Sequence, residues 1–369
     1  MVTRVVYDSR ETEGSSMALH GNIKIFASLV VAGIFLIAGN AAAGNDGAET
    51  TGGTTSSYEL GQGYRLGDSG FTLGGYTSLQ FQDLQNSDSR ASLSHLSMFV
   101  WWEGDSRLKF FSEIDSQDLL SADQQSGDND SRYLSIERIY FEYAFSDALT
   151  VRAGKFLTPV GRWNQIHADP LVWTTSRPLI TVNLFPDHFT GGMALGNMEM
   201  FGLQADYMLY TSIGTDVRPD PTEDPFNEAV GGRLNVPYDE KLQLGFSLAS
   251  FDQIASTEEH EVLAGADFVW SSDGYELSGE GAYRRSSYGS AHDARGGFIQ
   301  GVVPLCDKIF AVGRIESLHN PDLQQDARLW VLGLNYRHSR ALSLKMEFIH
   351  GINQNISAPG FLSSVSVLF

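Results

Sequence analysis

From residue 69 to the last residue, apolar and polar side chains alternate in segment after segment, and turn-forming residues separate the segments. This alternation is typical of β-strands that have one apolar and one polar face. Most segments are long enough for a tilted strand to cross the hydrocarbon layer of a membrane. Sixteen can be counted, at 69–84, 90–103, 107–118, 132–145, 149–158, 189–196, 199–212, 227–236, 241–252, 260–270, 275–286, 294–303, 308–318, 326–337, 341–351 and 360–369.

The connections between these segments differ in length in a regular way. After odd-numbered segments the connections are mostly longer than after even-numbered ones, and the longest is 159–188, after the fifth segment. Short turns on one rim and long loops on the other are typical of transmembrane barrels. Residues 69–369 are therefore predicted to form a 16-stranded antiparallel transmembrane β-barrel with a long third external loop. After even-numbered segments the connections are tight, at 104–106, 146–148, 196–198, 237–240, 271–274, 304–307 and 338–340.

The N-terminal part of the chain has the pattern of a targeting region. Lys24 precedes an apolar run from Ile25 to Ala38, which is followed by three alanines ending at Ala43. A basic start, a short apolar run and small residues are the parts of a secretory signal peptide. The run is too short to span a bilayer. The sequence therefore predicts, in order, an upstream extension, a signal peptide and a flexible periplasmic leader, at 1–16, 17–43 and 44–68.

The composition excludes several classes of function. The chain has 45 acidic and 25 basic residues, which is a poor balance for binding nucleic acid because phosphates require clustered Lys and Arg. Its single cysteine, Cys306, excludes an intramolecular disulfide and any CxxC site. The sequence contains no HExxH, phosphate-loop or dinucleotide-binding motif. We therefore predict no catalytic residues, no cofactor and no metal.

Alternation along the segments also assigns the two faces of the predicted wall. A charge on the lipid face near mid-bilayer costs about 2–4 kcal/mol, so charged positions should face the lumen. Segment 149–158 is irregular, because placing Arg152 inside sends Lys155 outward, and we expect Lys155 at the rim. Inward-facing positions in two clear segments are Glu276, Ser278, Glu280 and Arg284, and Ser343, Lys345 and Glu347.

The long connection 159–188 is the main candidate for a functional site. A segment of this length without secondary structure is unusual unless it is functional. Outside the barrel it would expose Trp163, Trp173 and several aliphatic side chains to water. We therefore predict that it folds into the lumen and narrows the pore. The candidate constriction residues are Arg162, Asp169, Arg177, Asp187 and His188, and the candidate residues of the facing pore wall are Arg152, Arg233, Arg284, Arg314 and Glu316.

The C-terminus carries a second candidate signal. The chain ends with alternating apolar residues from Val365 to a terminal Phe369. This ending resembles the C-terminal targeting strand of outer-membrane proteins. Because the last strand must pair with the first to close the barrel, we predict that Phe369 is an assembly signal, with the barrel-assembly machinery as a partner.

The stretch from Gly154 to Gly161, Gly-Lys-Phe-Leu-Thr-Pro-Val-Gly, resembles the porin superfamily that includes the phosphate-selective porin O/P type. In that family a Gly-Lys/Arg-Phe strand end opens a long third external loop. The resemblance implies a 16-stranded barrel, usually a trimer, with the third loop folded into the pore. Phosphate selectivity is not carried over, because the segments contain no dense ladder of Lys and Arg. The net charge of −20 favours a mild cation preference, whereas the arginines predicted for the constriction and the pore wall would favour the reverse.

The combined interpretation is a passive porin in the outer membrane of a Gram-negative bacterium, and not an enzyme. Its expected partners are outer-membrane lipid, small hydrophilic solutes or ions, and two further copies of the chain in a homotrimer. One alternative is an outer-membrane barrel enzyme of the protease or lipase kind, which requires an Asp/His or Ser/His set across different loops. Another is a structural or adhesive surface barrel, for which most of the predicted external loops are too short.

Overall fold

The structure is a computed structural model in which the predicted upstream extension, the signal peptide and the first part of the leader lie outside the described residues. Among the described residues, no helix is long and apolar enough to span a membrane. The ranges described are 56–104, 107–123, 133–166, 168–219, 224–254, 260–287, 292–321, 325–352 and 358–369.

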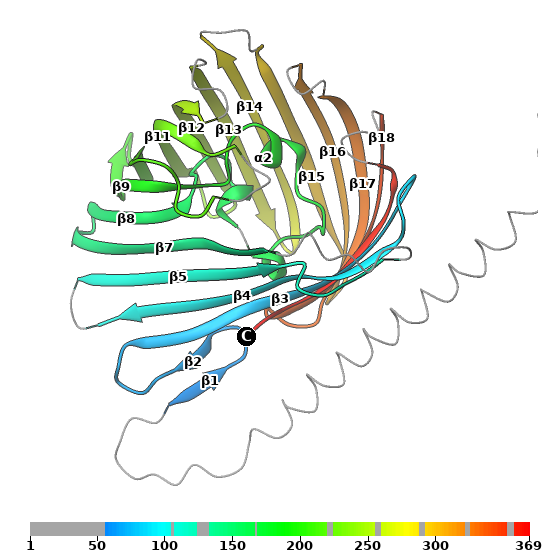
Figure 1. The fold of residues 1–369 in the computed structure, drawn as a ribbon, viewed down its shortest axis with the longest axis horizontal. Coiled ribbons are helices and arrows are strands. Elements are labelled where there is room, and N and C mark those ends of the chain that lie inside the picture. Colours follow the sequence, from blue (N-terminus) through cyan, green and yellow to red (C-terminus); the bar gives the residue numbers. More distant parts are fainter. Residues whose placement is uncertain are drawn as a thin grey trace, which may run out of the picture. The chain divides into compact units, whose positions relative to one another are not determined.

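Sixteen long strands form a closed antiparallel wall (Figure 1). The ring closes because the last strand pairs with the first, from Leu368 opposite Tyr76 to Gly360 opposite Leu84. The predicted fold class, an all-β barrel of 16 strands, is confirmed. The strands are β3 (Phe71–Leu84), β4 (Arg90–Glu103), β5 (Leu108–Gln117), β7 (Tyr133–Ser146), β8 (Leu149–Leu157), β9 (His188–Met200), β10 (Leu203–Ser212), β11 (Phe226–Pro237), β12 (Leu242–Gln253), β13 (Glu261–Ser272), β14 (Tyr275–Ser286), β15 (Ala294–Cys306), β16 (Ile309–Asn320), β17 (Gln325–Arg337), β18 (Leu342–Ile352) and β19 (Gly360–Leu368).

The remaining elements are short. β1 (Ser57–Glu59) and β2 (Gly63–Arg65) form a hairpin, and β2 pairs with β3 beside the place where β19 ends. This hairpin falls in the segment predicted as a flexible leader, so pairing extends the ordered part of the chain further toward the N-terminus than the sequence indicated. The others are β6 (Ser121–Asp123), η1 (Trp163–Gln165), η2 (Asp169–Leu171) and α2 (Leu179–Asn183).

The two faces of the wall follow the alternation of the sequence. In β16 the residue Ile315 as a whole, backbone included, is 63% exposed, whereas the whole residues Arg314 and Glu316 are 2% and 6% exposed. β18 repeats the pattern, with Met346 exposed and Lys345 buried. In these strands the exposed face carries the apolar residues that lipid requires, and Arg314, Glu316 and Lys345 point into the barrel.

Two turns differ from the sequence prediction. The turn expected at 196–198 lies at Phe201 and Gly202, whose φ angles are 54° and 79°. A two-residue hairpin turn needs positive φ at both positions, which Gly-Asn satisfies more readily than Phe-Gly, so the sequence favoured the wrong pair. Pro304, expected to begin a turn, lies within β15 at an irregularity where the pairing register shifts. Bulges are one of the few places where a strand accepts proline.

The closing seam involves the last residue of the chain directly. The backbone of Phe369 exchanges two hydrogen bonds with Gly75, of 2.8 and 2.9 Å. A Cβ on Gly75 would lie 3.0 Å from the Phe369 ring and 2.1 Å from the Ser97 carbonyl oxygen, so the ring covers a position that only glycine can occupy. Phe369 therefore ties the end of the chain to the first wall strand.

Deleting Phe369 is expected to reduce the amount of barrel inserted in the outer membrane, because these bonds and the ring contact are lost at the seam. Export should not change. Membrane fractionation and the heat-dependent shift of the folded band measure the two quantities. Phe361→Ala is the matched control, because this phenylalanine lies on the exposed face of the same strand. Equal insertion of the deletion variant and the unmodified chain would contradict the role in assembly.

Candidate functional site

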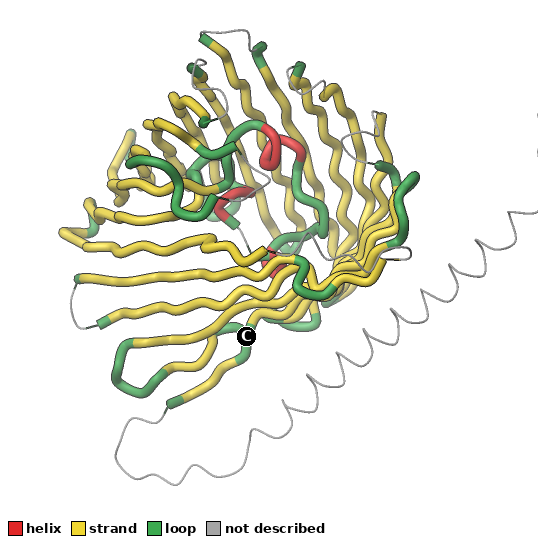
Figure 2. The backbone as a smooth tube through the Cα atoms, viewed as in Figure 1, coloured by secondary structure: helices red, strands yellow, loops and turns green. Residues whose placement is uncertain are grey.

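The segment that joins β8 to β9, residues 158–187, lies within the ring of strands, and we call it the inner segment (Figure 2). It consists of η1, η2, α2 and irregular stretches, interrupted by prolines that prevent continuous helix or strand. Its contacts reach several parts of the wall. The Gly161 N–H donates to Ser247 of β12, and the Asp169 carbonyl accepts a bond from Lys345 of β18.

Carboxylates of the wall accept hydrogen bonds from the backbone of the inner segment. Glu280 accepts from the Trp163 N–H at 2.5 Å, and Glu316 accepts from the Leu179 N–H at 2.7 Å. Glu347 binds two successive N–H groups, those of residues 175 and 176, at 2.9 and 2.7 Å. An irregular segment has backbone groups without partners of their own, and away from water these must be bonded elsewhere. The wall carboxylates therefore hold the segment in one position.

Cationic and amide side chains of the wall bind the carbonyls of the same segment. Arg314 donates to the Ser176 carbonyl and to the Thr174 hydroxyl, while Lys345 donates to the Asp169 and Thr174 carbonyls. Asn335 donates to the Trp173 carbonyl. Both the N–H groups and the carbonyl groups of the inner segment's backbone thus have charged or polar partners on strands β14 to β18.

The second half of the inner segment is anchored by apolar contacts. Leu179, Ile180, Leu184 and Phe185 belong to a buried cluster that also contains inward-facing residues of β8 to β13 and β15 to β19. Phenylalanines of β8, β9, β11 and β12 continue the cluster, with ring centroids 4.6 to 6.0 Å apart along the row. Most residues of this cluster belong to the strand ends next to the long connections, so the cluster lies near that rim of the barrel. It buries apolar side chains of the inner segment against the wall at this level.

The five residues predicted for the constriction lie in or directly after the inner segment. Arg177 and Asp187 form an ion pair of 2.9 Å. His188 begins β9, where its Nε2 lies 2.8 Å from the Glu137 carboxylate. Arg162 extends into a cavity described below. The sequence did not indicate that Arg177 would pair with Asp187 or that His188 would contact Glu137.

Asp169 lies in η2 near the inner face of β4 and β18. Burial alone would raise the pKa of its carboxyl, but the nearby charges of His95, Lys345 and Arg177 outweigh burial and lower that pKa below its ordinary value. Burial opposes the charge of Arg177, yet Asp187 and Asp169 raise the pKa of this guanidinium. Both groups are therefore charged at neutral pH.

The five residues predicted for the pore wall lie on the inner face, and each is paired there. Arg233 makes two bonds to Asp267, of 2.7 and 2.9 Å, and Arg284 pairs with Glu261 at 3.2 Å. Arg314 and Glu316 pair with each other and bind the inner segment. Arg233, Arg284, Arg314 and Glu316 are buried, so they support the segment or the wall instead of facing open water. Arg152 is half-buried, pairs with Glu142, and lies 4.3 Å from the Tyr140 ring.

The structure explains the irregular fifth segment of the sequence. Lys155 points outward, as expected, but is buried there by the β10–β11 connection. Its Nζ forms an ion pair of 2.7 Å with Asp216 and donates to the Val217 and Arg218 carbonyls. A neighbouring loop thus satisfies a charge that lipid could not.

Several functional residues were not among the sequence candidates. Glu280, Asn335, Arg337, Lys345 and Glu347 all bind the inner segment. Alternation already placed Glu280, Lys345 and Glu347 on the inner face, so an inward-facing charge was an available signal. The sequence contained no indication that these charges would meet backbone groups of one distant segment.

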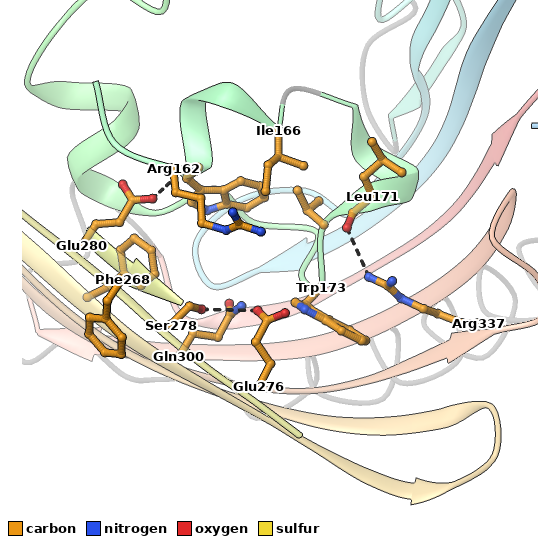
Figure 3. A pocket seen from close by; sticks show the side chains of 13 residues that line it. Arg162, Ile166, Leu171, Trp173, Phe268, Glu276, Ser278, Glu280, Gln300 and Arg337 are labelled. Atoms are coloured by element: carbon orange, nitrogen blue, oxygen red, sulfur yellow. Dashed lines mark hydrogen bonds between the residues drawn. The ribbon is translucent and has the colours of Figure 1, made fainter. Parts of the chain in front are cut away.

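A cavity of about 130 Å³ separates η1 and η2 from the wall (Figure 3). The inner segment contributes Arg162, Trp163 and Trp173, and the wall contributes Glu276 of β14 and Arg337 of β17. Glu276 is the second residue of its strand and Arg337 the last residue of its own, so the cavity lies toward the rim of the tight turns. Ser278 and Gln300 complete the polar wall.

Comparison with known proteins supports the fold. No protein-family model matches the chain. An uncharacterized protein of Aquifex aeolicus (strain VF5) is 31% identical over 119 residues, which are 32% of this chain and 26% of that protein. The chain therefore spans about a quarter of the length of this curated relative.

Solved structures that resemble the chain are outer-membrane barrels. OmpF of Salmonella typhi, in complex with daunomycin, matches with a TM-score of 0.59 and 8% identity over 82% of this chain and 98% of that one. OmpT of Vibrio cholerae in its trimer form matches with a TM-score of 0.56 and 9% identity over 81% and 99%. The chain therefore shares the barrel fold of these outer-membrane proteins. At these identities the likeness extends to the fold alone.

Proposed function

We propose that the protein is a passive channel of the outer membrane for small hydrophilic solutes and ions, and that it is not an enzyme. The observation that carries the proposal is the closed 16-stranded wall, with an apolar outer face and charged side chains inside. A barrel of this size is too wide for its own wall side chains to fill and leaves room for water. The inner segment occupies part of that space and sets the size of what can pass.

The proposed assembly is a homotrimer inserted in the outer membrane. The solved Vibrio cholerae barrel in trimer form supports this proposal by its fold. The excess of acidic residues over the whole chain supports a mild preference for cations, because negative charge near a pore concentrates positive ions. The predicted phosphate-selective subtype is not part of the proposal.

Recordings in planar lipid bilayers test the channel. The folded protein is expected to produce discrete conductance steps, with a reversal potential in asymmetric salt that indicates cation preference. The steps of a trimer should occur in groups of three. Protein unfolded by heat is the control and should produce none. A folded, inserted barrel without conductance steps would refute the channel, and a reversal potential of the opposite sign would refute the cation preference.

A further inference from the structure

Four charged side chains line the cavity beside η1 and η2, and only two of them bind the inner segment. Glu280 accepts the Trp163 N–H at 2.5 Å. The Arg337 guanidinium lies 3.6 Å from the centre of the Trp173 ring and donates to the Leu171 carbonyl at 3.2 Å. These contacts shape the cavity wall.

The other two charged groups make only long hydrogen bonds, and Glu276 in addition lies close enough to Arg337 for their charges to attract. Arg162 donates one long hydrogen bond, of 3.4 Å, to Gln243. Glu276 accepts one long bond, of 3.5 Å, from Ser278. Among the described residues, no ion pair includes either group. Figure 3 shows both side chains extending into the cavity, Arg162 from the inner segment and Glu276 from the wall. A guanidinium and a carboxylate are thus presented to one small space without neutralising each other.

The rest of the lining is largely apolar. Trp163, Trp173, Ile166 and Leu171 form the side of the cavity contributed by the inner segment. Indole and aliphatic surfaces favour an apolar or aromatic group in preference to water. Pockets that combine an apolar lining with a few placed charges are typical of small-molecule sites.

We propose that this cavity, which is open on one side, binds a small zwitterion, a free α-amino acid with an apolar or aromatic side chain, part of which extends out of the cavity. Its carboxylate pairs with Arg162, its ammonium group with Glu276, and its side chain packs on the indoles. A simple anion would satisfy Arg162 but meet repulsion from Glu276, and a simple cation would have the opposite difficulty. The site names a solute class for the channel and so rests on the proposed function.

A matched set of three ligands tests the proposal in single-channel recordings. Phenylalanine carries both charges, phenethylamine lacks the carboxylate, and 3-phenylpropionate lacks the ammonium group. Phenylalanine is expected to reduce the current at a concentration at least about ten times lower than either analogue, since each lost ion pair costs about a factor of ten. Equal effects of the three ligands, or none, would overturn the zwitterion site while the conductance steps themselves still support the channel.

Two variants assign the roles of the charges. Arg162→Gln should weaken phenylalanine about tenfold and leave phenethylamine nearly as effective as before. Glu276→Gln should also weaken the effect of phenylalanine about tenfold, and 3-phenylpropionate should reduce the current as effectively as before or more so. Arg285→Gln and Glu240→Gln are the controls, because both residues are exposed and lie outside the cavity. Identical losses for all three ligands in either variant would contradict the assigned pairings.

If no conductance steps occur, the channel fails and the site is tested by itself. Isothermal titration of the folded protein in detergent with the same three ligands then measures binding directly. Preference for phenylalanine, lost in both variants, supports the site. Absence of heat, with a folded barrel shown by circular dichroism, refutes it.

Discussion

Deleting residues 164–182 is expected to raise single-channel conductance several-fold and to flatten ion selectivity. This deletion removes η2 and most of η1 and α2. It also removes the contacts of residues 175, 176 and 179 with wall strands β16, β18 and β19. Conductance depends on the open cross-section, and selectivity depends on charged groups close to the ions. Without the segment, the anchoring charges of the wall would be solvated by water in a wider lumen.

A paired-cysteine variant provides the control for this deletion. The Thr175 and Ser364 hydroxyls lie 2.9 Å apart, so Thr175→Cys with Ser364→Cys, in a Cys306→Ser background, links the segment to β19 where it already lies. Conductance of the oxidised variant should equal that of the unmodified chain. An unchanged conductance after deletion would show that the segment does not limit the pore. A large fall on oxidation would show that the conducting state places the segment elsewhere.

Replacing Arg314 by methionine is expected to lower the free energy of unfolding by about 3–5 kcal/mol, the usual cost of removing one partner from a buried ion pair. The side chains of Arg314 and Glu316 are 0% and 2% exposed, and their charged atoms are 2.6 Å apart. Arg314 also holds the inner segment through Thr174 and Ser176, with bonds of 2.6 to 3.1 Å. The variant leaves Glu316 charged without its cation and several segment acceptors without a donor.

Urea unfolding followed by the heat-dependent band shift measures this loss. The double variant Arg314→Met with Glu316→Met should recover part of it, because an apolar pair does not leave a buried charge uncompensated. Arg285→Gln, on an exposed outward position of β14, is expected to change stability by less than about 0.5 kcal/mol. A single variant as stable as the unmodified chain would mean that water reaches Glu316 and that the pair is not buried in solution.

Much of the barrel is predictable because its rules are local. A strand in a barrel wall needs one face for lipid and one for the lumen, so alternation in β14, β16 and β18 identifies both strand and face. The exceptions have local physical causes as well. Phe201 and Gly202 form a turn that the residue types hardly favour, and the β1–β2 hairpin is held by pairing to β3 and not by a strong pattern of its own.

The candidate site was predictable in its location but not in its contacts. The length and apolar content of residues 159–188 led to the prediction that this connection folds into the lumen and narrows the pore. The structure shows its contacts with the inner face of the wall, and the constriction stays a prediction. Arg314 and Glu316 were expected to face the pore, whereas they are buried against Thr174 and Leu179. These partners are about 140 residues apart in sequence.

The sequence by itself determined the all-β class, the number of wall strands and the inward position of the charged residues, because each depends on a repeating two-residue period and on nearby turns. Only the tertiary structure decided which charged side chains bind the inner segment. It also decided which of them, such as Arg162 and Glu276, extend into a cavity. The physical reason is that an irregular segment has no period. Its path is set by backbone groups that find partners on strands distant in sequence, and those partners become defined only when the wall has closed.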